Sequence, residues 1–374
     1  MSLVKCSHSL LRMLSTTTAL VLLMLVPQSG LAEGRTGNVY VPTNQPSGNS
    51  IMVFHRDAAG VLTFVSSVAS GGIGAGTGAD PLASQGAVVL SRGNRLLFAV
   101  NAGSDSISVF AVSGDRLALS DTVSSGGTLP VSLTVRDNLL YVLNAGGTPN
   151  ISGFTVESPG NRLVPLAGST QNLPGGAAAS PAQVSFSPDG NVLVVTEKGT
   201  NQIDSFALRD DGTAQPGVSF PSSGTTPFGF AFGHDDVAIV SDAGSAALSS
   251  YKIDEEGNLD LVTPALGDTQ IATCWVVVPR NGRFAYTTNA GSGTISSYTV
   301  AEGGKLALLD VVAASVASGS APTDMALSNN SRFLYVRNGG NGTIGGFRIN
   351  DDGSLSPVTT VGGLPAGTQG IAAR

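Results

Sequence analysis

Residues 97–110 read LFAVNAGSDSISVF: an apolar strand, an Asn-x-Gly turn and a second strand that ends on an aromatic side chain. Variants of this pattern follow at 140–154 (LYVLNAGGTPNISGF), 193–206 (LVVTEKGTNQIDSF), 238–251 (AIVSDAGSAALSSY), 285–298 (AYTTNAGSGTISSY) and 334–347 (LYVRNGGNGTIGGF). A looser copy lies at 39–54. Seven copies spaced about 49 residues apart indicate one repetitive architecture rather than two unrelated domains.

Each unit has room for four short strands. In the fourth unit, an apolar segment at 181–186 leads through the type I turn sequence SPDG at 187–190 to a second strand at 192–196. A third strand at 203–208 follows, and the DDG sequence at 210–212 turns into a weak fourth strand. Alternating strands with frequent Gly-bearing turns predict an all-β protein, and four strands per unit are typical of a propeller blade. The sequence therefore predicts a seven-bladed β-propeller with four antiparallel strands per blade.

The two ends of the repeat array predict that the ring closes on itself. The first unit lacks an inner strand, because its first recognisable strand, near Val39, corresponds to a second strand. Residues 368–373 (TQGIAA) resemble residues 84–89 (SQGAVV), the inner strand of the second unit. We therefore expect the C-terminal segment to supply the inner strand of the first blade, which leaves no open sheet edge.

The composition excludes several other classes of protein. Forty-nine of the 374 residues are Gly, but they show no Gly-x-y period, so the chain is not collagen-like. An apolar content of 41% and a modest net charge argue against disorder. Only 12% of the residues are charged, against a usual ~25%, so the charged faces of helical bundles and coiled coils are missing.

The first 32 residues are expected to be a secretory signal peptide, because Lys5 and Arg12 precede an apolar stretch at 14–26 and small residues end at Ala32. The apolar stretch is shorter than the ~20 residues that a membrane-spanning helix needs. Residues 33–374 are then a single propeller domain. Loss of Lys5 and Arg12 changes the net charge from −7 to −9 and leaves Cys274 as the only cysteine.

These features predict a secreted or periplasmic protein with no intramolecular disulfide and no membrane span after signal removal. The acidic balance argues against nucleic acids and anionic membranes as partners, since both are bound by basic patches. We expect a monomer whose partner is a small molecule in the central channel.

The LYVxNxG…I…F units, the P-x-x-apolar inner strands and the SPDG turn resemble those of the seven-bladed lactonase family. This family comprises the 6-phosphogluconolactonase-like and carboxymuconate-cyclase-like propellers, also called cycloisomerase 2, and the repeats are also similar to those of YVTN-type propellers. The resemblance covers essentially the whole mature chain. It implies an enzyme that opens or closes lactone rings with His, Arg and Glu residues around the central channel.

The histidines depart from that family pattern. His55 and His234 are the only histidines beyond residue 32. His55 follows Phe54 on the third strand of its unit, and His234 lies in a turn between first and second strands. Neither position belongs to the channel mouth, so we expect no channel histidine.

Candidate site residues lie where the loops into the inner strands and the second-to-third-strand turns share one face. The loops, such as 71–85 (GGIGAGTGADPLASQ), are dominated by small uncharged residues. The turns carry residues that tolerate left-handed backbone and cap their own turns, namely Asn44, Asn101, Asn144, Asp242, Asn289 and Asn338. The fourth unit has Glu197 and Lys198 at this place instead, and the seventh has Arg337 just before its Asn.

We predict that Glu197 acts as a general base and that Lys198 or Arg337 stabilises an oxyanion. The third position of the inner strands supplies further polar or aromatic candidates, among them the only Trp. The residues predicted to bind the substrate are Gln183, Trp275, Asp324 and Asp242.

Each of these residues also has a purely structural explanation. Glu197 and Lys198 are compatible with an exposed turn pair, and Trp275 with a channel plug or a packing residue. Asp324 would accept hydrogen bonds from the inner-strand backbone, and Arg337 would pair with an acid or cover an apolar neighbour.

We expect neither a metal nor another cofactor. One Cys and two misplaced His do not make a zinc site, and a calcium site built from Glu197, Asp242 and Asp324 has no spacing signature. Cys274 is expected to be an inert buried thiol, because no His lies at a comparable depth.

Three functions remain open. The first is an exported lactonase-like enzyme that hydrolyses or isomerises a small lactone at the central channel; an anionic phosphorylated lactone fits poorly because the protein is acidic. The second is a non-enzymatic propeller that binds a small molecule or a partner protein, which the missing His and the sparse charge favour. The third, a structural surface repeat protein, fits less well with a single closed ring.

Overall fold

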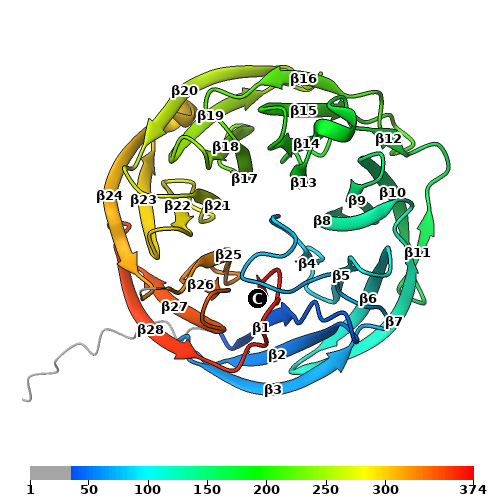
Figure 1. Cartoon of the computed structure of the whole chain (residues 1–374), viewed down its shortest axis with the longest axis horizontal. Coiled ribbons are helices and arrows are strands. Elements are labelled where there is room, and N and C mark those ends of the chain that lie inside the picture. Colours follow the sequence, from blue (N-terminus) through cyan, green and yellow to red (C-terminus); the bar gives the residue numbers. More distant parts are fainter. Residues whose placement is uncertain (1–34, 318) are drawn as a thin grey trace, which may run out of the picture. The chain divides into compact units, whose positions relative to one another are not determined.

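The computed structural model describes residues 35–317 and 319–374, so the predicted signal peptide at 1–32 lies outside the described residues. Seven antiparallel sheets are arranged around a central axis (Figure 1). Six of the sheets have four strands. The third sheet along the chain has a short fifth strand, which pairs with the third strand of that sheet. The predicted seven-bladed, all-β propeller is therefore confirmed. Within the described ranges, no helix has the length and apolar character of a membrane span.

The blades follow the chain, and their strands are given from the channel outward. Blade 1 contains β29 (Ala372–Ala373), β1 (Gly37–Pro42), β2 (Ser50–Arg56) and β3 (Leu62–Ala69). Blade 2 contains β4 (Val88–Leu90), β5 (Leu96–Asn101), β6 (Ser106–Ser113) and β7 (Arg116–Ser124). Blade 3 contains β8 (Thr128–Arg136), β9 (Leu139–Gly146), β10 (Asn150–Glu157) and β11 (Arg162–Pro165), with β12 (Gln171–Asn172) beside β10.

The remaining four blades repeat this order. Blade 4 contains β13 (Pro181–Phe186), β14 (Val192–Glu197), β15 (Gln202–Ala207) and β16 (Val218–Pro221). Blade 5 contains β17 (Pro227–Phe232), β18 (Val237–Asp242), β19 (Ala247–Ile253) and β20 (Leu259–Gly267). Blade 6 contains β21 (Thr273–Val277), β22 (Phe284–Asn289), β23 (Thr294–Val300) and β24 (Leu306–Ser315). Blade 7 contains β25 (Pro322–Leu327), β26 (Phe333–Asn338), β27 (Thr343–Ile349) and β28 (Leu355–Val361). Two three-residue 3₁₀ helices, Gly176–Ala178 and Glu302–Gly304, lie in loops.

The core lies between neighbouring blades. The second strands of blades 4 to 7 (β14, β18, β22 and β26) are buried at every residue, because both of their faces pack against adjacent sheets. Such strands read as continuous apolar runs rather than as alternating patterns. The outermost strands are largely exposed: in β7 only Leu117 is buried. This burial explains the low charge of the chain.

Tyrosine hydroxyls connect successive blades. Tyr141, Tyr286 and Tyr335, at the third position of their second strands, donate to the main-chain oxygens of Gly212, Gly353 and Gly60 at 2.7, 2.7 and 2.8 Å. Each acceptor lies in the third-to-fourth-strand turn of the next blade. A Cβ atom on Gly60, whose φ is +94°, would lie 2.4 Å from the Phe333 ring of the preceding blade. The recurring Tyr and the recurring turn Gly therefore form one inter-blade contact.

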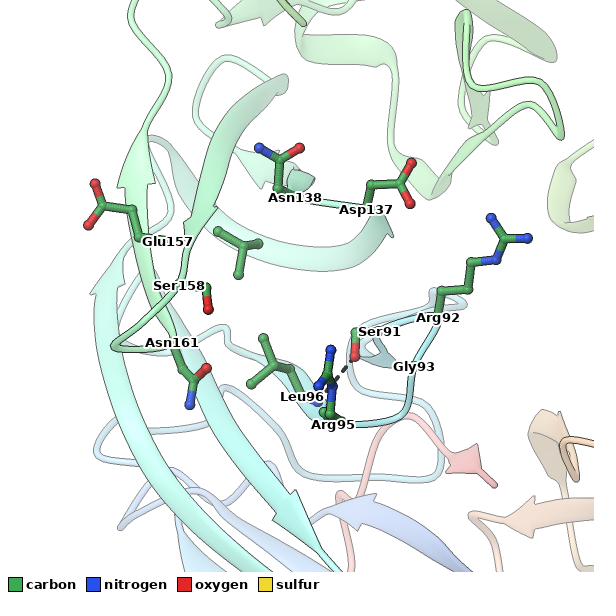
Figure 2. A pocket seen from close by; sticks show the side chains of 11 residues that line it. Ser91, Arg92, Gly93, Arg95, Leu96, Asp137, Asn138, Glu157, Ser158 and Asn161 are labelled. Carbon is green, nitrogen blue, oxygen red and sulfur yellow. Dashed lines mark hydrogen bonds between the residues drawn. The ribbon is translucent and has the colours of Figure 1, made fainter.

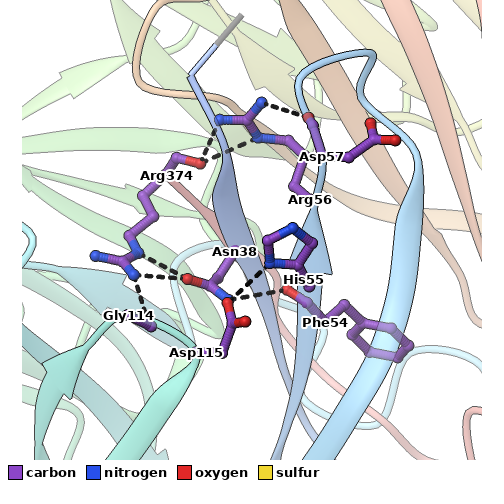
Figure 3. A network of polar contacts seen from close by, with 8 residues as sticks. All are labelled: Asn38, Phe54, His55, Arg56, Asp57, Gly114, Asp115 and Arg374. Atoms are coloured by element: carbon purple, nitrogen blue, oxygen red, sulfur yellow. Dashed lines mark hydrogen bonds and ion pairs between the residues drawn. The ribbon is translucent and has the colours of Figure 1, made fainter.

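The C-terminal strand closes the ring, as the sequence predicts. β29 pairs antiparallel with β1, with Val39 opposite Ala373 and Tyr40 opposite Ala372. The Arg374 side chain donates from Nε and Nη2 to Asn38 Oδ1 at 3.0 and 2.7 Å. Its Nη2 also donates to Gly114 O of blade 2 at 2.6 Å, so here an arginine makes the inter-blade contact that a tyrosine makes elsewhere (Figure 3).

Further polar contacts surround this closure. The buried Arg56 donates from Nε and Nη2 to the main-chain oxygen of Arg374 at 3.2 and 3.0 Å. Asn38 Nδ2 donates to Asp115 Oδ1 at 2.8 Å, and His55 Nδ1 lies 2.9 Å from the same oxygen (Figure 3). The hydrogen bonds from His55 and Asn38 hold the pKa of Asp115 below its ordinary value. His55 therefore belongs to the blade 1–blade 2 contact rather than to the channel.

Replacement of Arg374 by Ala tests how strongly this closure stabilises the ring. We expect the free energy of unfolding to fall by about 2 kcal/mol, because hydrogen bonds from a charged donor are lost and the Asn38 and Gly114 oxygens lose their partner. Urea unfolding of the purified protein measures the change. Arg116→Ala, at an exposed position on β7, is the matched control and should change stability by less than ~0.5 kcal/mol. Equal stability of the two variants would contradict a closing role for Arg374.

Candidate functional site

Five inner strands carry an irregularity next to the channel. The register with the second strand shifts between Pro130 and Ser132, Pro181 and Gln183, Pro227 and Phe230, Thr273 and Trp275, and Pro322 and Met325. In blade 7 Thr323 and Asp324 lie within the shift, and the φ of Asp324, +88°, is in the left-handed region that non-Gly residues rarely adopt. A bulge re-aims the side chains around it.

A cavity of about 320 Å³ runs along the inner strands of blades 1, 2, 3, 4 and 7. At the end where these strands begin it is lined by Gln85, Gln183 and Asp324, and at the end where they finish by Leu90 and Val135. Of the seven residues predicted from the sequence as site residues, Gln183 and Asp324 line this cavity.

The loop at 71–86, which we call the plug, leads into β4 and reaches into the centre of the ring (Figure 1). Gln85 crosses the channel to blade 6, where its Nε2 donates to Val276 O at 2.8 Å and its Oε1 accepts from Val276 N at 3.1 Å. A Cβ atom on Gly229 would lie 2.1 Å from Gln85 Oε1, so blade 5 leaves room for this side chain only because the residue is Gly.

Three of the predicted site residues hold the plug in place. Lys198 Nζ donates to Ala83 O at 2.7 Å and to Pro181 O at 2.9 Å. Trp275 Nε1 donates to Ser84 O at 2.9 Å, and its ring packs edge-on against Phe228 with centroids 4.9 Å apart. Arg337 Nη1 donates to Ala79 O at 3.2 Å. The structure therefore brings these residues together around the plug backbone.

The plug also contributes a carboxylate, Asp80, that the sequence reasoning missed. Burial raises the pKa of Asp80, and the positive charges of Arg337 and Lys198 oppose that rise. Burial likewise raises the pKa of Asp324 to about 7, with Arg337 again opposing it and Asp80 adding to it. The only sequence signal for Asp80 is that it is the one charged residue of a loop rich in Gly and Ala.

Lys198 of blade 4 and Cys274 of blade 6 are close enough to interact electrostatically. Burial lowers the pKa of Lys198 to about 8, against the attraction of Asp80. Burial raises the pKa of Cys274 to about 12, so the thiol is inert at neutral pH, as expected from the sequence. Among the described residues, no three His, Cys, Asp or Glu side chains gather in a way that would hold a metal ion.

Glu197 and Asp242 lie inside their blades rather than at the cavity. Glu197 is fully buried, so the alternative of an exposed turn pair is wrong for this residue. Its Oε1 accepts from Gly175 N at 3.0 Å and its Oε2 from Thr200 Oγ1 at 2.5 Å. Asp242 accepts from Ser222 Oγ at 2.7 Å and from Ser249 Oγ, and burial raises its pKa to about 6.

The recurring turn Asn has a different role from the one expected. Of the six turn residues, only Asn44 has a positive φ. The others lie in their second strands, all but Asn144 at the last residue. Several bond to the third strand: Asn101 Nδ2 donates to Ser108 Oγ at 2.7 Å and Asn289 Nδ2 to Ser296 Oγ at 2.8 Å. These residues therefore tie strands together inside the blade, because a buried amide needs a partner.

In blade 4 two carboxyl groups take the places of this Asn and Ser. Asp204 follows Glu197 by seven residues, as Ser108 follows Asn101, and both acids are fully buried. Burial and the neighbouring Glu197 carboxyl raise the pKa of Asp204, while Ser219 Oγ donates to it at 2.5 Å. Two adjacent buried carboxyls cannot both be ionised cheaply, so the pair retains a proton at neutral pH.

Both polar atoms of the Gln183 side chain are also hydrogen-bonded to the backbone of a neighbouring blade. Its Nε2 donates to Phe230 O at 2.9 Å and its Oε1 accepts from Phe230 N at 2.8 Å, which joins blade 4 to blade 5. Gln183 and Gln85 therefore reach the cavity with amide groups that are already paired.

A larger surface pocket, about 670 Å³, lies between the turns of blades 2 and 3 and contains none of the predicted site residues. Figure 2 shows its charged groups: Arg92 and Glu157 lie on opposite sides of the pocket and do not converge. Both are exposed, as are Arg95 and Asp137. We therefore place the candidate site at the central cavity instead.

A family model described as lactonase, 7-bladed beta-propeller matches residues 47–172, 150–274 and 236–369, which together span most of the chain. The chain belongs to this lactonase family. A comparison with curated proteins gave no match.

Several solved structures are similar to this lactonase-family propeller. A protein from Lactobacillus plantarum superposes with a TM-score of 0.71 at 19% identity, covering 91% of this chain and 100% of that one. A periplasmic gluconolactonase from Pseudomonas aeruginosa gives 0.67 at 19%, covering 90% and 99%. A protein from Bacteroides fragilis, provisionally named a 6-phosphogluconolactonase, gives 0.66 at 17%, covering 90% and 98%. At these identities the structures show a shared fold.

Replacement of Asp204 by Asn tests the buried carboxyl pair. Because the pKa of Asp204 is higher in the folded than in the unfolded chain, unfolding releases a proton as the pH rises above the ordinary carboxyl range. Wild-type stability should therefore fall between pH 5 and pH 9, and Asp204→Asn should remove part of that fall. We expect the variant to be more stable than wild type by roughly 2 kcal/mol at pH 9 and about equal at pH 5.

Urea unfolding at pH 5, 7 and 9 measures this difference. Asp210→Asn, at an exposed position six residues further on, is the control for the loss of one negative charge and should follow wild type at all three values. A constant difference between Asp204→Asn and wild type across the pH series would rule out a retained proton.

Proposed function

We propose that this lactonase-family propeller hydrolyses a small, uncharged lactone in the central cavity, with Asp324 as the general base. In this reaction Asp324 removes a proton from a water molecule, and the resulting hydroxide attacks the lactone carbonyl. The ring C–O bond breaks, and the ring oxygen takes a proton to give the open hydroxy acid. Family membership supports the reaction class, and the position of Asp324 supports the assignment of the base.

The placement of Asp324 is the observation that carries this proposal. Asp324 lines the cavity, is 2% exposed, and is held at a strained φ by the bulge in β25. Its Oδ1 accepts from Met325 N at 2.8 Å, and its Oδ2 has no partner among the described residues. A carboxyl with a pKa near 7 is suited to act as a base at neutral pH. Strained backbone is often found at functional sites.

The other predicted site residues receive supporting roles. Glu197, which the sequence suggested as the base, has both oxygens bonded inside blade 4, so our proposal gives its role to Asp324. Lys198 and Trp275 fix the plug, and Gln183 joins two blades at the cavity end. Arg337 is a buried positive charge that acts on Asp324.

The charges of the site favour an uncharged substrate. The carboxylate of Asp324 lies at the inner end of the cavity, and neither Lys198 nor Arg337 lines it. A phosphorylated lactone would therefore meet a negative charge without a compensating cation. Because the plug fills one end of the channel, the substrate would enter from the opposite face, which carries the first-to-second-strand turns. The predicted signal peptide adds the expectation that the reaction takes place outside the cytoplasm.

A second candidate function is a propeller that binds such a molecule without converting it. The full pairing of Gln85 and Gln183 favours it, because the cavity then offers few free hydrogen-bond donors to stabilise an oxyanion. Turnover distinguishes the two functions.

The test is hydrolysis of a panel of lactones by the mature protein, including glucono-1,5-lactone and its 6-phosphate, above the spontaneous rate. We expect activity on the uncharged member, with kcat rising with pH as Asp324 loses its proton near pH 7. Asp324→Asn should lower kcat by at least ~100-fold. Asp260→Asn, at an exposed position on β20, is the control.

The outcomes separate the proposals. An active wild type with an equally active Asp324→Asn, shown by circular dichroism to be folded, would remove Asp324 as the base. Saturable binding of the lactone without turnover would support the second candidate.

A further inference from the structure

A group of buried polar atoms without partners lies behind Asp324, between blade 7 and the plug. Arg337 is fully buried on β26. Its Nη1 donates to Ala79 O at 3.2 Å and to Thr368 Oγ1 at 3.3 Å. Its Nε and Nη2 have no hydrogen-bond partner in the part of the chain that the structure describes. A buried guanidinium with free N–H groups is costly unless something accepts from them.

Three acceptors are orphaned in the same neighbourhood. Asp324 Oδ2, Asp80 Oδ1 and Gln369 Oε1 are all buried and have no partner among the described residues. Arg337 is close enough for its charge to act on Asp80 and on Asp324, yet none of its nitrogens lies within 4.0 Å of an oxygen of either. Unpartnered donors of Arg337 and unpartnered acceptors of its neighbours are therefore buried in one neighbourhood without direct contact between the guanidinium and either carboxylate.

The charges of these residues decide which kind of group could partner their orphaned atoms. Arg337 repels a cation, and Asp80 and Asp324 repel an anion. The occupant must also donate to the orphaned oxygens and accept from the orphaned N–H groups. Water meets these conditions, and buried water typically makes two to four hydrogen bonds to such otherwise unsatisfied groups.

We propose that ordered water molecules bridge Arg337 to Asp80, Asp324 and Gln369, and that this hydrated cluster makes Asp80 and Arg337 the positioning residues of Asp324. The role as positioning residues rests on the proposed function, whereas the hydrated cluster does not. The plug is then part of the site, because its Asp80 completes the cluster.

The two positioning residues act on Asp324 in opposite directions. The charged groups that face Asp324 are Arg337 on β26 and Asp80 on the plug, and Lys198 of blade 4 acts on it indirectly through Asp80. Arg337 lowers the pKa of Asp324 and Asp80 raises it. Loss of the Arg337 charge should therefore raise the pKa of Asp324, and loss of the Asp80 charge should lower it.

The first experiment is a crystal structure of the mature protein at a resolution that shows water. We expect at least one water molecule within hydrogen-bond distance of Arg337 Nε or Nη2 and of an oxygen of Asp324 or Asp80. Direct contact of the guanidinium with either carboxylate, with no water between them, would overturn the proposal.

The second experiment follows the Asp324 carboxyl by NMR titration of protein labelled with ¹³C at the Asp side-chain carboxyls, with Asp324→Asn identifying the resonance. Asp80→Asn should lower the Asp324 midpoint by about 1 pH unit, and Arg337→Met should raise it by a similar amount. Asp260→Asn should leave the midpoint unchanged. A general loosening of the fold would move both variants in the same direction.

If Arg337→Met does not fold, the Asp324 midpoint in Asp80→Asn and the water molecules in the crystal structure still test the proposal. An unchanged midpoint in Asp80→Asn, or equal shifts in both variants, would overturn the positioning role. Neither measurement requires turnover, so a protein that shows the water cluster but hydrolyses no lactone would disprove the proposed function and leave the cluster standing.

Discussion

The pairing of β29 with β1 is the constraint on which the rest of the structure depends. A strand from the end of the chain completes the first blade, so each sheet has a neighbour on both sides. The channel exists only because seven inner strands are held at a common distance from one axis. Side chains more than 200 residues apart in sequence, such as Asp80 and Arg337, act on one another for the same reason. Cys274 is the only cysteine in the described ranges and is unpaired, so hydrogen bonds and packing maintain this geometry there.

The plug gives the ring two unlike ends. At one end, Gln85 crosses the channel and pairs with the backbone of Val276, as a strand residue would. Lys198, Trp275 and Arg337 then bind carbonyl groups of the plug. Residue types that suggest catalysis therefore act here as anchors, because a loop that enters a propeller axis brings carbonyl groups that need donors. The other end keeps a cavity with Asp324 at its base.

The scarcity of charge makes the buried charges informative. Most of the chain packs between sheets, where an ionised group is costly, so each buried acid or base requires a compensating arrangement. In blade 4, Glu197 and Asp204 occupy the places of an Asn and a Ser and retain a proton between them. At the channel, Arg337 compensates Asp80 and Asp324 without direct contact. Asp324 lines a cavity, whereas Glu197 and Asp204 do not. We therefore place the candidate site at the channel and regard the blade 4 pair as a structural variation.

Repeat period, turn chemistry and the match between 368–373 and 84–89 were sufficient to predict the fold, the blade number and the closing strand, because these follow from local patterns repeated along the chain. Two of the seven predicted site residues reach the cavity, and three others meet at the plug. Asp80 could not be found from its loop, and the burial of Glu197 could not be read from its turn. Those properties depend on which segments of different blades face each other across the axis. The distance between those segments is set by closure of the ring, and only the tertiary structure decides it.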